Sequence, residues 1–142
     1  MRNQAGHSFP TGVSDVREPW IELQAIDSGR RVLSRFGGPG ADGLIAPSSL
    51  RFGMDIAKSD GTILLLHELS ETTRLPFNRR VPGGGSMDVF LQAPTSLPAG
   101  TVELDAVLLY RNIRTPYFRA ATGDALSNAP ETEVARAIVP PN

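Results

Sequence analysis

Hydrophobic and polar residues alternate along several short segments of this chain. In residues 20–27, Ile21, Leu23 and Ala25 fall on one face of an extended chain, with polar residues between them. A period of two is typical of a β-strand that buries one face. Residues 31–36 follow after an Asp-Ser-Gly turn, so we predict that the two segments pair as an antiparallel hairpin.

Four further segments have the length and composition of strands. Residues 87–92 and 102–110 also alternate, and residues 134–139 form a last, weaker strand. Residues 62–66 are continuously apolar after an Asp-Gly pair, which is typical of a strand buried on both faces. Helical signal is confined to residues 116–126, where a glycine interrupts the pattern.

These short strands, with one short helix at most, indicate the fold class. Gly and Pro contribute 14 and 12 of the 142 residues, more than an average protein contains, and they lie between the strands. We predict an all-β protein, an antiparallel β-sandwich of the immunoglobulin or fibronectin type, formed by residues 1–142 as a single domain. Jelly-roll and small-barrel topologies stay open, because alternation does not determine strand order.

Composition excludes several classes of chemistry. The chain has no cysteine, so it forms no disulfide, thiolate metal site or covalent haem attachment. Its net charge of −1 provides no basic field for nucleic acid. No apolar run approaches the ~20 residues of a membrane span. Lys58 is the only lysine among 14 cationic residues. The arginine bias suits carboxylate and phosphate recognition, but codon usage in a GC-rich genome is the explanation that we favour.

The histidines and glycines offer little support for catalysis. His7 and His67 lie far apart in the sequence, and no metalloprotease, nucleophile-elbow or paired-carboxylate motif accompanies them. In a strand, His67 and Glu68 would point to opposite faces and make a poor metal pair. The glycines at 83–85 lack the Lys-Ser/Thr and helix start of a phosphate-binding loop, so we expect a hairpin loop there. We expect no enzymatic activity.

The most informative motif is Gly-His-Ser-Phe-Pro-Thr-Gly at residues 6–12. Pro10 fixes its own φ and biases Phe9 toward an extended conformation, while Gly12 permits a positive φ. The motif therefore predicts a rigid loop that carries one imidazole, that of His7. The simplest role for that imidazole is a hydrogen bond across the loop.

This loop, followed by a strand with a tryptophan, resembles the haem-free region that follows the haem-binding part of many bacterial multihaem c-type cytochromes. There, a GHxxPTG-type loop opens a β-sandwich. Residues 109–121, LYRNIRTPYFRAA, are similar to the LxYRxxxPxxxR-type segment near the end of the same region. The turn at 81–83 also precedes a strand as in the family. The resemblance spans nearly the whole chain.

The resemblance implies a function without a cofactor in this chain. The family binds haem through CxxCH motifs, which are absent here. It therefore implies a non-catalytic accessory domain that packs against, or docks onto, a haem-bearing region in a parent or partner polypeptide, in the periplasm or at the cell surface. It also places Met1 inside the family's first strand, and a missing first strand would leave an open sheet edge that favours self-association.

Five residues become candidates for contact with that haem. In the family, the loop histidine faces the haem-bearing region, so the resemblance makes His7 a candidate for an axial ligand or a haem-edge contact, with His67 as a weaker second candidate. Arg111, Arg114 and Arg119 lie among aromatic residues and are candidates for pairing with haem propionates. The alternative for each arginine is an ordinary ion pair with Asp or Glu.

A function from a different class also stays open. β-Sandwiches serve as cell-surface binding or adhesion domains that recognise carbohydrate or protein through their loops. An exposed aromatic platform would favour that function. Trp20 and the two tyrosines lie in or beside the predicted strands and helix, which does not favour it.

Overall fold

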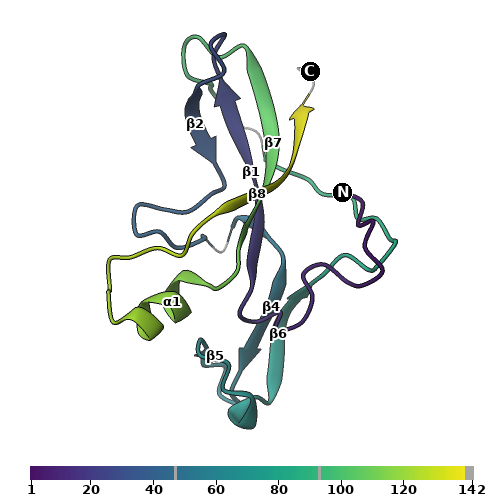
Figure 1. Ribbon diagram of the computed structural model, residues 1–142, viewed down its shortest axis with the longest axis vertical. Helices are drawn as coiled ribbons and strands as arrows, with labels where there is room; N and C mark the ends of the chain where they lie inside the picture. The colour runs from purple at the N-terminus through teal and green to yellow at the C-terminus, as the bar shows by residue number, and fades with distance from the viewer. Residues whose placement is uncertain (47, 93, 140–142) are drawn as a thin grey trace.

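A computed structural model describes residues 1–46, 48–92 and 94–139, which form two antiparallel sheets (Figure 1). This confirms the predicted all-β, sandwich-like fold; the immunoglobulin-type topology and the single-domain organisation stay predictions. The larger sheet has the order β2 (Val32–Phe36), β1 (Glu18–Ile26), β7 (Glu103–Arg111), β8 (Thr132–Val139), and β3 (Leu50–Arg51) also pairs with β1. The smaller sheet has the order β5 (Ile63–Leu64), β4 (Gly53–Ala57), β6 (Arg74–Arg79).

Strand β1 is the centre of the larger sheet, and all nine of its residues are buried. It pairs with β7 along its whole length, with Ile21 opposite Leu108. It also pairs with β2, which confirms the predicted hairpin. In the hairpin turn, one carboxylate oxygen of Asp27 accepts hydrogen bonds from the backbone N–H groups of Gly29 and Arg31, both at 2.9 Å. This Asp turn is one reason why the sequence folds back at that point.

Apolar side chains pack on both faces of the β1–β7 pair. On one face, Ile21 and Leu108 pack with Phe52 and Val81. On the other face, Trp20 is fully buried and forms a second cluster, so it provides no exposed aromatic surface for carbohydrate. The second cluster combines Trp20, Val107 and Leu109, with Ile45 packed against them.

The chain crosses from one sheet to the other between β3 and β4. Phe52 separates the two strands, and Gly53 follows with a φ of 122°. A Cβ at Gly53 would lie 2.9 Å from the carbonyl oxygen of Ser14, so the close approach of the N-terminal segment requires glycine here. Sequence patterns did not predict β3, β4 or β6.

Two predicted strands differ from the structure. Of residues 62–66, only Ile63 and Leu64 form a strand, and Leu65 and Leu66 are each 45% exposed, so the prediction of a strand buried on both faces is wrong. Residues 87–92 do keep their alternation, with the odd-numbered side chains half-buried, but they form no strand. They run beside the larger sheet without joining a ladder.

The single α-helix of the described residues, α1 (Thr115–Thr122), follows β7. It ends at Gly123, whose left-handed backbone (φ 72°) lets its N–H group donate to the Arg119 carbonyl. This glycine is the one that interrupts the helical pattern in the sequence, and it serves as the C-terminal cap. A short 3₁₀ helix, η1 (Leu69–Glu71), follows β5. Within the described ranges, none of the helices has the length and hydrophobicity to cross a membrane.

Candidate functional site

His7 lies on an exposed loop whose backbone is fixed by its neighbours. The side-chain amide of Asn3 donates to the carbonyl oxygens of His7 (2.7 Å), Val81 (3.1 Å) and Pro82 (3.1 Å). Phe9 and Val81 exchange two backbone hydrogen bonds of 2.8 Å. The imidazole itself is exposed, and its Nδ1 lies 3.3 Å from the carbonyl of the next residue, Ser8. The loop is therefore held firmly while its imidazole faces solvent.

The glycine-rich turn at 83–85 supports this loop from the neighbouring segment. A Cβ at Gly83 would lie 2.7 Å from both the Gly6 carbonyl carbon and the His7 nitrogen. Only glycine permits so close an approach of two backbone segments. The turn is therefore a packing partner of the His7 loop, a role that the sequence alone did not indicate.

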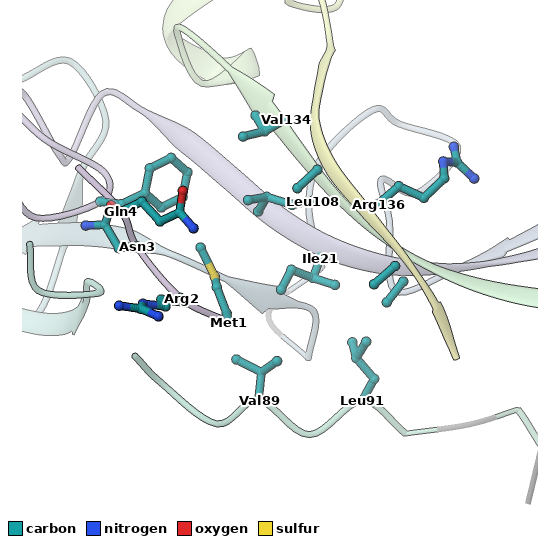
Figure 2. A pocket seen from close by; sticks show the side chains of 14 residues that line it. Met1, Arg2, Asn3, Gln4, Ile21, Val89, Leu91, Leu108, Val134 and Arg136 are labelled. Carbon is teal, nitrogen blue, oxygen red and sulfur yellow. The ribbon is translucent and has the colours of Figure 1, made fainter. Parts of the chain in front are cut away.

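An apolar cavity of about 420 Å³ lies beside the same loop. Figure 2 shows Val89 and Leu91 facing Ile21 of β1 across this space. Met1 lies between these side chains and Arg2. The lining is mostly apolar. Val89 and Leu91 belong to it, which explains why residues 87–92 alternate although they form no strand. The remaining lining residues come chiefly from the N-terminus, β7 and β8: Arg2, Asn3, Gln4, Phe9, Ala106, Leu108, Val134, Ala135, Arg136 and Ala137.

His67 is paired with a buried carboxylate. It lies in the turn between β5 and η1 with a φ of 59°, so it is not the strand residue assumed in predicting that His67 and Glu68 point to opposite faces. Its Nδ1–H group donates to Asp15 Oδ2 at 2.7 Å. The side chain of Asp15 is 4% exposed and that of His67 is 33% exposed. No sequence spacing links these two residues, so the pair was not predicted.

Arg111 is enclosed by the protein. Its guanidinium donates to Glu18 Oε2 (3.1 Å), the Gly43 carbonyl (2.8 Å), Thr115 Oγ1 (2.8 Å) and Glu131 Oε1 (2.7 Å). Its side chain is only 2% exposed. These contacts match the ordinary ion-pair alternative. Nε of Arg111 has no hydrogen-bond partner among the described residues, but the buried side chain leaves a haem propionate no access to it.

Arg114 forms a second, partly buried ion pair. Its Nη2 donates to Asp55 Oδ1 at 2.7 Å, and its Nη1 donates to the Asp15 carbonyl at 3.3 Å. Burial alone would raise the pKa of the Asp55 carboxyl, but hydrogen bonds from Arg51 and the charge of Arg114 hold that pKa below its ordinary value of 3.8. Arg114 thus joins β4 to the segment that carries Asp15.

Arg119, on α1, joins the helix to two loops of the chain, at Ser127 and Asp42. Its Nε donates to the Ser127 carbonyl (2.9 Å) and its Nη2 to the Asp42 carbonyl (2.6 Å). An open groove of about 550 Å³ runs between this face of α1 and the chain after β5. Its lining is apolar apart from this arginine: Leu44, Leu65, Pro116, Arg119, Ala120, Gly123 and Ala125.

The five candidates do not converge on one point. His67 and Arg114 meet at Asp15, and Arg114 and Arg111 share Glu18, at 3.9 Å and 3.1 Å respectively. The contacts of the His7 loop are instead with Asn3 and the turn at 83–85. Across residues 1–46, 48–92 and 94–139, no group of three or more His, Asp or Glu side chains is arranged to hold a metal ion.

Comparison with known proteins gives one informative match. No family model matches the sequence, and no curated protein matches it. A crystal structure of a penta-haem cytochrome c552 from Thermochromatium tepidum is similar to this chain, with a TM-score of 0.66 and 17% sequence identity. The match covers 97% of this chain and 34% of that cytochrome. This chain therefore has the fold of about one third of a penta-haem cytochrome.

Proposed function

We propose that this chain is a non-catalytic accessory domain of a multihaem, cytochrome-type electron-transfer protein, and that it packs against the haem-bearing region. The proposal is carried by the fold match, which takes in nearly all of this chain but only a third of the penta-haem cytochrome. Without cysteine, this chain attaches no c-type haem itself. The haem would belong to a parent or partner polypeptide.

The His7 loop is the proposed contact surface. Its imidazole is exposed, while its backbone is fixed by Asn3 and by the close approach of Gly83. A loop that is ordered before binding loses little conformational entropy when a partner docks on it. The apolar cavity beside Phe9 adds a surface on which a partner side chain can be buried.

The proposed location follows from the proposed partner. Haem attachment of the c type takes place outside the cytoplasm, so we place this chain in the periplasm or at the cell surface. The formal net charge of −1 gives no general attraction to nucleic acid or anionic lipid, in keeping with a protein partner.

The test begins with the genomic sequence that flanks the coding segment. We expect repeated CxxCH motifs there, in the same reading frame or in an adjacent gene. The encoded haem polypeptide, matured with its haems, is then mixed with this chain, and binding is measured by calorimetry. We expect a defined complex that His7→Ala weakens, whereas Ser28→Ala, on the exposed β1–β2 turn, leaves it unchanged. The absence of CxxCH motifs, or of a complex, would contradict the proposal.

A further inference from the structure

The backbone of His67 adopts a conformation that few residues accept. Its φ of 59° is in the left-handed region, where non-glycine residues are uncommon. Such conformations persist only where the surrounding structure holds them, and they gather at functional sites. Here the surrounding structure includes the Asp15 carboxylate, which is bonded to the imidazole.

The bond to Asp15 determines which nitrogen of His67 is available. An ionised carboxylate only accepts hydrogen bonds, so the proton of the neutral imidazole lies on Nδ1 and the lone pair on Nε2. Within the described part of the chain, Nε2 has no hydrogen-bond partner, and the side chain is one-third exposed. Histidines that bind metals commonly donate their other N–H group to a carboxylate in this way, which fixes the ring and increases the basicity of the ligating nitrogen.

A single imidazole suits only a metal that already carries most of its ligands. No further His, Asp or Glu cluster completes a metal site in the residues that the structure describes. A haem iron has four porphyrin nitrogens, and in a c-type haem the histidine of the CxxCH motif provides one axial ligand, so one position is left. Leu65, Leu66 and Leu69 surround His67 in sequence and are about half exposed, which suits contact with the apolar face of a porphyrin.

The two histidines are connected through one segment. Asp15 lies on the N-terminal segment 6–15, which begins with the His7 loop and ends at the residue that binds His67. We propose that His67, positioned by Asp15, is the axial ligand that this chain offers to a haem iron of the haem-bearing region. This inference rests on the proposed function. It leaves the His7 loop as the docking contact and assigns iron ligation to His67.

The test uses a short haem c peptide obtained by proteolysis of a cytochrome c. Such a peptide keeps one CxxCH motif and one axial histidine, and its sixth iron position is open. Titrating the full chain into it, we expect the visible spectrum to change from the high-spin to the low-spin, bis-histidine form. His67→Asn should remove this change; Asn tolerates the left-handed region, so this variant should fold, which circular dichroism checks. Ser28→Ala, on the exposed β1–β2 turn, is the control and should leave the titration unchanged. His7→Ala separates the two histidines, because loss of the titration in this variant would assign ligation to His7.

Asp15→Asn tests the positioning role. We expect it to weaken the titration by about 10–100-fold while His67 is still present, as removal of the hydrogen-bond partner of a ligating histidine does. A titration that His67→Asn leaves unchanged, or that His7→Ala abolishes, would overturn the assignment to His67. So would the lack of a low-spin spectrum with the unmodified chain. The proposed function is tested separately, by whether the unmodified chain forms a complex with the CxxCH polypeptide.

Discussion

Replacement of Arg111 tests whether this arginine supports the fold or is available to a haem propionate. Its guanidinium makes four hydrogen bonds at 2.7–3.1 Å and its side chain is almost fully buried. In Arg111→Met, Glu18 keeps only Arg114, at 3.9 Å, while the half-exposed Glu131 keeps Arg35 at 3.1 Å. One buried carboxylate is thus left without close compensation. Breaking a buried pair in this way costs about 3–5 kcal/mol.

The assay is urea unfolding followed by circular dichroism. We expect Arg111→Met to lower the free energy of unfolding by about 3–5 kcal/mol. The control is Arg31→Met, which removes an arginine with an 82% exposed side chain paired to Asp27 and should cost at most about 1 kcal/mol. Adding Glu18→Gln to Arg111→Met should cost less than the sum of the two single changes, because the carboxylate charge is removed as well. Equal, small losses for Arg111→Met and Arg31→Met would show that the buried Arg111 network does not stabilise the fold.

Two further predictions concern the His7 loop and the buried carboxylate of Asp55. Gly83→Ala places a Cβ against the backbone of Gly6 and His7, so it should lower the free energy of unfolding, measured by thermal unfolding, by about 1–3 kcal/mol. The control is Gly6→Ala, whose Cβ meets nothing within 4 Å and which should stay within about 0.5 kcal/mol of wild type. Equal effects of the two changes would contradict the close approach of Gly83 to the His7 loop. The lowered pKa of Asp55 stabilises the fold above the unfolded-state pKa, and this stabilisation is lost as pH falls through the folded-state pKa. The difference in the free energy of unfolding between wild type and Asp55→Asn should therefore be largest near neutral pH and shrink below pH 3.8. A difference that does not change with pH would contradict a lowered pKa of Asp55.

Local patterns were sufficient where neighbouring residues determine the structure. The β1–β2 hairpin follows from alternation and an Asp-Ser-Gly turn, and α1 ends at the Gly123 that the sequence marks. Strand β6 is different: it is an edge strand with Pro76 inside it and mostly exposed side chains. None of the β6 residues is fully buried, so no buried face imposes alternation on it, and an edge strand tolerates proline. No pattern therefore indicated β6.

The prediction that residues 62–66 form a strand buried on both faces was wrong for a related reason. The run of four apolar residues that follows Thr62 predicted burial, but β5 lies at the edge of a three-stranded sheet, and only Leu64 of this run is buried. Burial requires a second layer of structure, which a sequence window does not contain. The ion pairs were not predictable from the sequence either, because Asp15 and His67 are 52 positions apart and Arg111 and Glu18 are 93 positions apart. Only the fold brings such residues together.

Hydrogen–deuterium exchange on this chain, alone and in complex with the CxxCH polypeptide encoded beside it, shows directly whether this chain docks through the His7 loop. We expect binding to slow exchange of the backbone amides in residues 6–15 and 65–69, because the His7 loop and the His67 turn are then covered. Protection confined to β2 or to the β1–β2 turn, with residues 6–15 exchanging as they do in the free chain, would contradict docking through this loop.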